Sequence, residues 1–175
     1  MLKNLADSIT EYACYQIAAG AQVIQVFDSW AGVLSPHDYD IFAAPYQKMI
    51  LDEIKARHPE IPTIMYIKHS GALLERMAKT GVDIVSLDWT VDMAEGRARL
   101  DAARKAAGMS GRTGVQGNLD PALLYCDHDT IEKRTIEVIE KAGSGHVMNL
   151  GHGIEATTPE ENAAHFVNVC RNYRY

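Results

Sequence analysis

Apolar and polar positions alternate in blocks along this chain, and the blocks repeat. Short apolar runs of strand length are separated by longer stretches in which apolar residues recur at helical spacing. The runs lie at residues 22–27, 62–67, 83–87, 113–117 and 146–150. Strands that alternate with helices predict parallel βαβ units joined by right-handed crossovers. We therefore expect an α/β fold built on a parallel sheet.

The expected helices are marked by their end residues. Helical spacing over residues 5–19 stops at Gly20. Ser35 and Pro36 are typical of an N-cap followed by the first helical position, and they predict one long helix that reaches Arg57. Other helices are expected over about 71–79, from Asp92 to about Ala107, from Asp129 with Glu132 onward, and after a capping box at residues 158–161. Because no linker or low-complexity tract interrupts this pattern, residues 1–175 are expected to form a single domain.

Polar residues follow every expected strand. They are Asp28-Ser29, Lys68-His69-Ser70, Asp88-Trp89, Asn118-Leu119-Asp120 and the Asn-Leu-Gly-His-Gly segment at residues 149–153. In parallel α/β folds, and above all in (β/α)8 barrels, the carboxyl ends of the strands build the active site. This distribution therefore predicts a functional site at that end of the sheet.

The number of units leaves two architectures open. Five βα units are too few to close an eight-stranded barrel, and an unclosed piece exposes two strand edges and an apolar inner face. The chain is then either an open doubly wound sheet or the last five units of a barrel whose earlier part lies elsewhere. In the second case we expect association with whatever completes the barrel.

Composition excludes several classes of function. The net charge is −6 and the 17 Lys and Arg residues are scattered, which argues against a nucleic-acid partner. No apolar run reaches the roughly 18 to 20 residues of a membrane span. The first residues resemble neither a signal peptide nor a transit peptide, so we expect no targeting segment in this chain. Cys14, Cys126 and Cys170 lack CxxC spacing, and free thiols are expected.

Taken in order, the strand-end motifs resemble the uroporphyrinogen decarboxylase family, specifically its carboxyl-terminal half, over essentially all 175 residues. The motifs are Phe-Asp-Ser-Trp-Ala-Gly at 27–32 with Pro45-Tyr46 downstream, Gly81 followed by Leu-Asp-Trp-Thr at 87–90, Val-Gln-Gly-Asn-Leu-Asp-Pro at 115–121, and Asn-Leu-Gly-His-Gly at 149–153. The resemblance implies the carboxyl-terminal part, about five βα units, of a (β/α)8 TIM barrel. Residues 1–175 would then be a single partial barrel domain, with the amino-terminal part of the family fold absent.

The same resemblance implies a carboxy-lyase. Such an enzyme removes carboxyl groups from the four acetate side chains of uroporphyrinogen to give coproporphyrinogen, in haem and chlorophyll biosynthesis, without a metal or an organic cofactor. It further implies a homodimer in the cytoplasm or a plastid. Of the residues that the family is known for, two carry over: His152 as a catalytic and substrate-binding residue, and Ser29 as a substrate-binding residue. Lys68, the lysine that this loop shares with the family, is a third candidate for substrate binding.

Each candidate residue also has a plainer interpretation. In that interpretation His152 is a turn histidine bonded to a backbone carbonyl, and the Ser29 hydroxyl forms hydrogen bonds with backbone groups of its own turn. Gly151 and Gly153 are alternatively a phosphate cradle. For the Asp88 and Asn118 loops, support of the backbone is the better prediction. The role of His69 is open.

Two functions are compatible with a partial barrel of this family. The family aspartate and arginines that bind substrate lie in the amino-terminal half, so this chain alone is expected to be a poor catalyst. A truncated and catalytically silent relative, serving as a binding or structural subunit, is therefore the alternative. A related branch of the superfamily comprises zinc-dependent methyltransferases, whose metal is held by His and Cys residues at strand ends. Cys14 and Cys170 lie in expected helices and Cys126 lies beyond the Asn-Leu-Asp-Pro turn, so the sequence does not favour a zinc site of this kind.

Overall fold

The fold was analysed in a computed structural model, which describes residues 1–174. Within that range there is one sheet of five strands, β1 (Ile24–Phe27), β2 (Thr63–Tyr66), β3 (Ile84–Ser86), β4 (Gly114–Gln116) and β5 (His146–Val147). Every neighbouring pair is parallel, and the spatial order is the order in the sequence. A doubly wound sheet reverses its winding at a switch point. The order found here has no reversal, so the barrel-type winding is the correct alternative.

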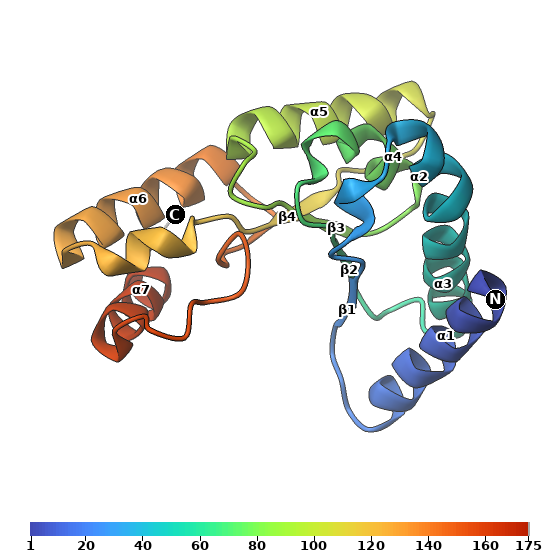
Figure 1. Cartoon of the computed structure of the whole chain (residues 1–175), viewed down its shortest axis with the longest axis horizontal. Coiled ribbons are helices and arrows are strands. Elements are labelled where there is room, and N and C mark those ends of the chain that lie inside the picture. The colour runs from blue at the N-terminus through green and yellow to red at the C-terminus, as the bar shows by residue number, and fades with distance from the viewer. Residues whose placement is uncertain (175) are drawn as a thin grey trace.

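The helices form an arc around the strands. In Figure 1 the arc runs from α1 and α3, through α2, α4 and α5, to α6 and α7. Their bounds are α1 (Leu2–Ala18), α2 (Pro36–Phe42), α3 (Ala44–Arg57), α4 (Leu74–Lys79), α5 (Met93–Ala106), α6 (His128–Ala142) and α7 (Glu160–Asn172). Short 3-10 turns follow three strands: η1 (Ala31–Val33), η2 (Ser70–Ala72) and η3 (Pro121–Tyr125).

The two faces of the sheet have different surroundings. Side chains alternate between the faces along each strand, and the set that points to the helices forms the main core: Ile24, Val26, Met65, Val85 and Val115. The opposite face carries Gln25, Phe27, Tyr66, Ser86 and Gln116, in register across four strands. Phe27 on this face is 67% exposed. The helices thus cover the outer face of the sheet. On the inner face Tyr66, Ser86 and Gln116 are buried, and the exposed apolar side chain is that of Phe27 on the edge strand β1.

The prediction of one long helix from Pro36 to Arg57 is wrong, because the helix is interrupted at Ala43. Ala43 has φ −121° and ψ −59°, and α3 begins at the next residue with Pro45 in its first turn. Pro45 has no amide hydrogen, and in a continuous helix its ring would clash with the carbonyl of Ile41. The proline therefore starts a second helix instead of lying inside one.

Three further boundaries differ from the sequence-based expectation. Helix α6 is capped by Asp127 rather than Asp129, with the Asp127 carboxylate accepting from Thr130 N at 2.8 Å. The capping box at residues 158–161 does not form, because Pro159 occupies the N-cap position and Thr158 lies one residue too early. Strand β5 ends at Val147, and pairing resumes only at a single bridge between Leu119 and Leu150. The cap at Asp92 is confirmed, with bonds from Ala94 N and Glu95 N.

Candidate active site

The loop after β3 is the structural centre of the strand-end region. Asp88 is 0% exposed. Its carboxylate accepts from Ser70 N at 3.1 Å, from Thr90 N at 2.8 Å and from Thr90 Oγ1 at 2.5 Å. One buried carboxylate therefore fixes both its own loop and the loop after β2. The supporting role predicted for Asp88 is confirmed.

The loop after β4 is tied to the same centre by Asn118. Its Nδ2 donates to the carbonyl of Asp88 at 2.8 Å and to that of Val91 at 2.6 Å. Asp120 then begins η3 by accepting from Ala122 N at 2.9 Å. These bonds satisfy backbone groups that would otherwise be unpaired. Asn118 therefore has the supporting role that the sequence predicted.

The segment at residues 149–153 is held against both neighbouring loops. Gly151 N donates to Leu119 O at 2.7 Å, and Tyr66 Oη donates to Gly151 O at 3.1 Å. A Cβ on Gly151 would lie 2.4 Å from Trp89 N. A Cβ on Gly153 would have no heavy atom within 4 Å. Gly151 is thus required for close packing against Trp89, which accounts for this glycine without a phosphate.

Three basic side chains from two loops gather around the indole ring of Trp89, which belongs to a third loop. The rings of Trp89 and His152 have centroids 4.5 Å apart at 63°, and those of Trp89 and His69 are 5.3 Å apart at 60°. Lys68 Nζ lies 5.4 Å from the Trp89 centroid. We call Lys68, His69, Trp89 and His152 the Trp89 cluster. It brings together two of the three site residues that the sequence predicted, Lys68 and His152.

Trp89 was not predicted as a site residue, because the sequence pattern grouped it with Asp88 as support for the loop. An aromatic residue beside a strand end is usually core, and nothing local distinguishes this one. A usable signal was present, however, in the order of the motifs. The tryptophan lies in the loop after the middle strand of five, and Lys68 and His152 follow strands on either side of it.

Ser29 lies one strand away from the Trp89 cluster. Its side chain is half-buried, and its carbonyl accepts from Lys68 N at 3.3 Å. The preceding Asp28 accepts from Gln47 Nε2 at 2.8 Å, and Gln47 Oε1 accepts from Tyr39 Oη at 2.5 Å. Burial, and then the charge of Asp28, raise the pKa of Tyr39, so its hydroxyl stays a donor. Ser29 is thus attached through its backbone to the loop that carries Lys68.

A pocket of about 420 Å³ opens on the inner face of the sheet beside His152. This size lies in the range of small-molecule sites. Its floor is polar, because Gln116 Nε2 donates to Ser86 Oγ at 2.9 Å and to Gln25 Oε1 at 3.2 Å. Its apolar walls include Phe27 and Phe166. His152 lines this pocket, whereas Ser29 and Lys68 do not. The pocket and the Trp89 cluster therefore share His152.

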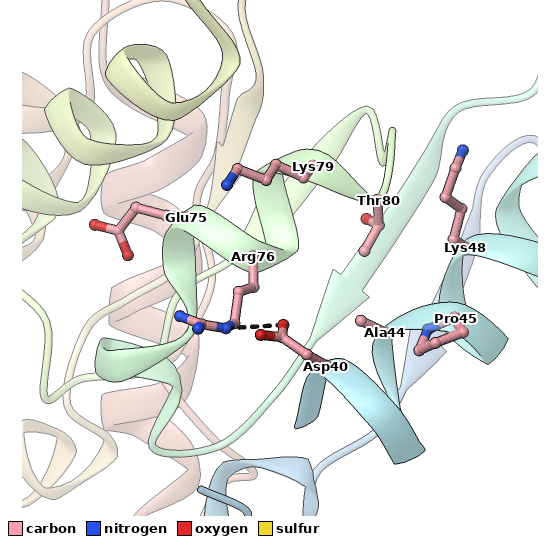
Figure 2. Close-up of a pocket in the computed structure, with 8 residues that line it drawn as sticks. All are labelled: Asp40, Ala44, Pro45, Lys48, Glu75, Arg76, Lys79 and Thr80. Atoms are coloured by element: carbon pink, nitrogen blue, oxygen red, sulfur yellow. Dashed lines mark hydrogen bonds and ion pairs between the residues drawn. The ribbon is translucent and has the colours of Figure 1, made fainter. Parts of the chain in front are cut away.

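A second hollow lies in the helical layer, away from the strand ends. This groove has a volume of about 300 Å³ and lies between α4 on one side and α2 and α3 on the other. Figure 2 shows Arg76 of α4 paired with Asp40 of α2, and the two side chains are 2.8 Å apart. Lys48, also on its wall, pairs with Asp52 at 2.8 Å. Most of the charged residues here are paired within the chain, Glu75 with Arg99 among them, and no strand-end residue lines the groove. We therefore place the functional site on the inner face.

The part of the chain that the structure describes has neither a metal-binding cluster nor a helix suited to span a membrane. Among residues 1–174, no group of three or more His, Cys, Asp or Glu side chains is arranged to hold a metal ion. Cys14 lies in α1 and Cys170 in α7, as expected, and Cys126 ends η3. None of the helices described is both long and apolar enough to cross a bilayer.

Comparison with known proteins points to one family. The family model described as Uroporphyrinogen decarboxylase (URO-D) matches residues 1–173. A uroporphyrinogen decarboxylase of a Picosynechococcus species is 54% identical over 172 residues, which are 98% of this chain and 47% of that protein. One from a Synechococcus species is 56% identical, covering 98% and 45%, and one from Prochlorococcus marinus is 56% identical, covering 95% and 45%. The chain thus spans about half the length of the curated relatives it matches.

Proposed function

This chain belongs to the uroporphyrinogen decarboxylase family, and we propose that it forms the carboxyl-terminal half of a decarboxylase acting on uroporphyrinogen. The product is coproporphyrinogen, formed when the four acetate side chains lose their carboxyl groups. One observation carries the proposal. His152 lines a pocket on the inner face of the sheet and also belongs to the Trp89 cluster, which contains the ammonium group of Lys68 as a cation for carboxylates.

The remaining half of the barrel is the partner that we propose. Residues 1–175 form a partial barrel domain in this account, and an amino-terminal half of the family fold completes it. The two edge strands support this proposal, because Phe27 is 67% exposed on β1 and Val147 is 42% exposed on β5. Apolar strand residues with this exposure are normally covered. We further propose that the completed barrel acts as a homodimer in tetrapyrrole synthesis.

The chemistry requires a proton and no oxidant. When an acetate side chain loses CO₂, the C–C electron pair stays on the side-chain carbon, and a proton converts that carbon to a methyl group. Because a proton simply replaces CO₂, no redox cofactor takes part. A histidine beside the pocket can supply that proton as a general acid. We assign that role and carboxylate binding to His152, charge attraction to Lys68, and hydroxyl donation to a carboxylate to Ser29.

Charge explains why one half is expected to be insufficient. The substrate carries eight carboxylates, whereas this chain has a net charge of −6. Within the Trp89 cluster the cations are Lys68 and any histidine that is protonated. Preorganised positive charge supplies much of the stabilisation in reactions of this kind. The other half must therefore contribute most of the groups that bind carboxylates.

Single-residue variants in the completed barrel test these assignments. His152→Ala should lower kcat by roughly 10² to 10⁴-fold, the range for loss of a general acid or base. Ser29→Ala and Lys68→Met should mainly raise KM, because they remove contacts to carboxylates. Lys133→Met, at an exposed position of α6, is the matched control for loss of a positive charge. If His152→Ala stayed within twofold of the unmodified enzyme, the role assigned to His152 would be wrong.

A further inference from the structure

We infer that Trp89 is a positioning residue for the proposed decarboxylation: its indole ring orients the imidazole of His152 and the ammonium group of Lys68 toward substrate carboxylates. This inference rests on the proposed function. Nothing in the motifs or in the family resemblance assigned the residue such a role. It follows from the geometry of the Trp89 cluster and from the way in which Trp89 is itself held.

The first observation is that one ring contacts all the basic groups of the cluster. His152 lies 4.5 Å from Trp89 between centroids, His69 lies 5.3 Å away, and both meet the indole in edge-to-face arrangements. Lys68 Nζ is 5.4 Å from the same centroid, within the distance at which a ring face attracts a cation. Edge-to-face pairs have a preferred relative orientation. The contacts therefore define the orientation of the two imidazole rings relative to the indole, as well as their distance from it.

The second observation is that Trp89 is anchored from both sides of its backbone. Asp88 before it is buried and accepts three hydrogen bonds, one from Ser70 N and two from Thr90. Gly151 packs so closely that a Cβ there would lie 2.4 Å from Trp89 N. The groups around the ring are less constrained by their own chain. Lys68 has a long flexible side chain, and His152 lies between two glycines. A fixed ring that orients mobile groups reduces the entropy lost on binding.

Simple packing and positioning make different predictions for conservative variants. If Trp89 only fills space, Trp89→Leu and Trp89→Phe should act alike. If its aromatic face orients the cluster, Phe should preserve much of the effect and Leu should not. Trp30→Leu is the matched control, because Trp30 is the other tryptophan of the chain and is 80% exposed.

The decisive readout uses the 175-residue chain without any substrate. Proton NMR should show cross-peaks between the His152 ring and the Trp89 indole in the unmodified chain, with ring-current shifts on the His152 protons. Trp89→Leu should remove those shifts, Trp89→Phe should keep part of them, and Trp30→Leu should change nothing. Absence of the cross-peaks in the unmodified chain, or unaltered His152 signals in a folded Trp89→Leu chain, would overturn the inference.

Turnover by the completed barrel supplies the functional readout. We expect Trp89→Leu to lower kcat/KM for uroporphyrinogen at least tenfold and Trp89→Phe to recover most of that loss. Equal losses in the two variants would overturn the positioning role. If the unmodified barrel does not decarboxylate uroporphyrinogen while the His152 signals respond to Trp89 as expected, the proposed function falls and the geometric part of the inference is supported. The two failures can therefore be distinguished.

Discussion

Gly151 and Gly153 stand two residues apart in one segment and have opposite surroundings. The first packs against the Trp89 backbone, where an added Cβ would meet Trp89 N at 2.4 Å, and the second has open space around its Cβ position. Gly151→Ala should therefore destabilise the fold by about 1–3 kcal/mol, the usual cost of overpacking. Gly153→Ala should stay within roughly 0.5 kcal/mol. Equilibrium unfolding in urea compares the two variants, and equal values would refute this account of Gly151.

At this scale, the sequence identified polar residues but not their arrangement. Lys68 and His152 were predicted because each follows an apolar run in a motif shared with the family, and the structure brings both to Trp89. That meeting depends on how far each loop folds back over the strand ends. The buried carboxylate of Asp88 and the close approach at Gly151 decide this. These contacts join different loops, and Trp89 and Gly151 are more than 60 positions apart in the chain, so local sequence patterns carry no record of them.

At the scale of elements, β5 contains a histidine that makes stability depend on pH. His146 Nε2 donates to Gly117 O at 2.5 Å. Burial lowers the pKa of His146, the bond to Gly117 opposes this, and the positive charge of Arg97 lowers the pKa further. The folded state thus binds this proton less readily than the unfolded state. The free energy of unfolding contributed by His146 is present above about pH 6.5 and is lost as the pH falls below that value.

Unfolding measured at a series of pH values tests this prediction. His146→Gln keeps a side-chain N–H for the Gly117 carbonyl and cannot titrate, so the loss of stability below about pH 6.5 should become shallower. His37→Gln, at an exposed position of α2, removes an imidazole without that buried contact. The same pH slope in the His146 variant and the unmodified chain would contradict the assignment.

Element boundaries show where sequence patterns were informative and where competing local effects prevailed. The cap at Asp92 was predicted and confirmed, because a carboxylate at that position satisfies amides of the first turn. The single helix from Pro36 to Arg57 was wrong, because apolar periodicity continues through a proline that the backbone cannot accommodate. The start of α6 was misplaced by two residues, since Asp127 and Asp129 are equally good caps by composition.

At the scale of the whole molecule, alternation of strands and helices predicted the parallel sheet, and the structure confirms it. The choice between a doubly wound sheet and a barrel could not be made from that alternation, because both repeat the same βα unit. Spatial strand order decides it, and in Figure 1 the helices form an arc around the strands. The pocket beside His152 lies on the inner face of the sheet. The completion of the barrel and the proposed function therefore both concern this inner face.

The central claim is that this inner face becomes a uroporphyrinogen decarboxylase site when the barrel is completed. The most direct measurement follows the loss of uroporphyrinogen and the appearance of coproporphyrinogen with this chain alone, with a separately purified amino-terminal half alone, and with both. We predict product only from the mixture, with little or none from either half. Absence of product from the mixture, with both halves folded and associated, would contradict the claim and favour a catalytically silent subunit.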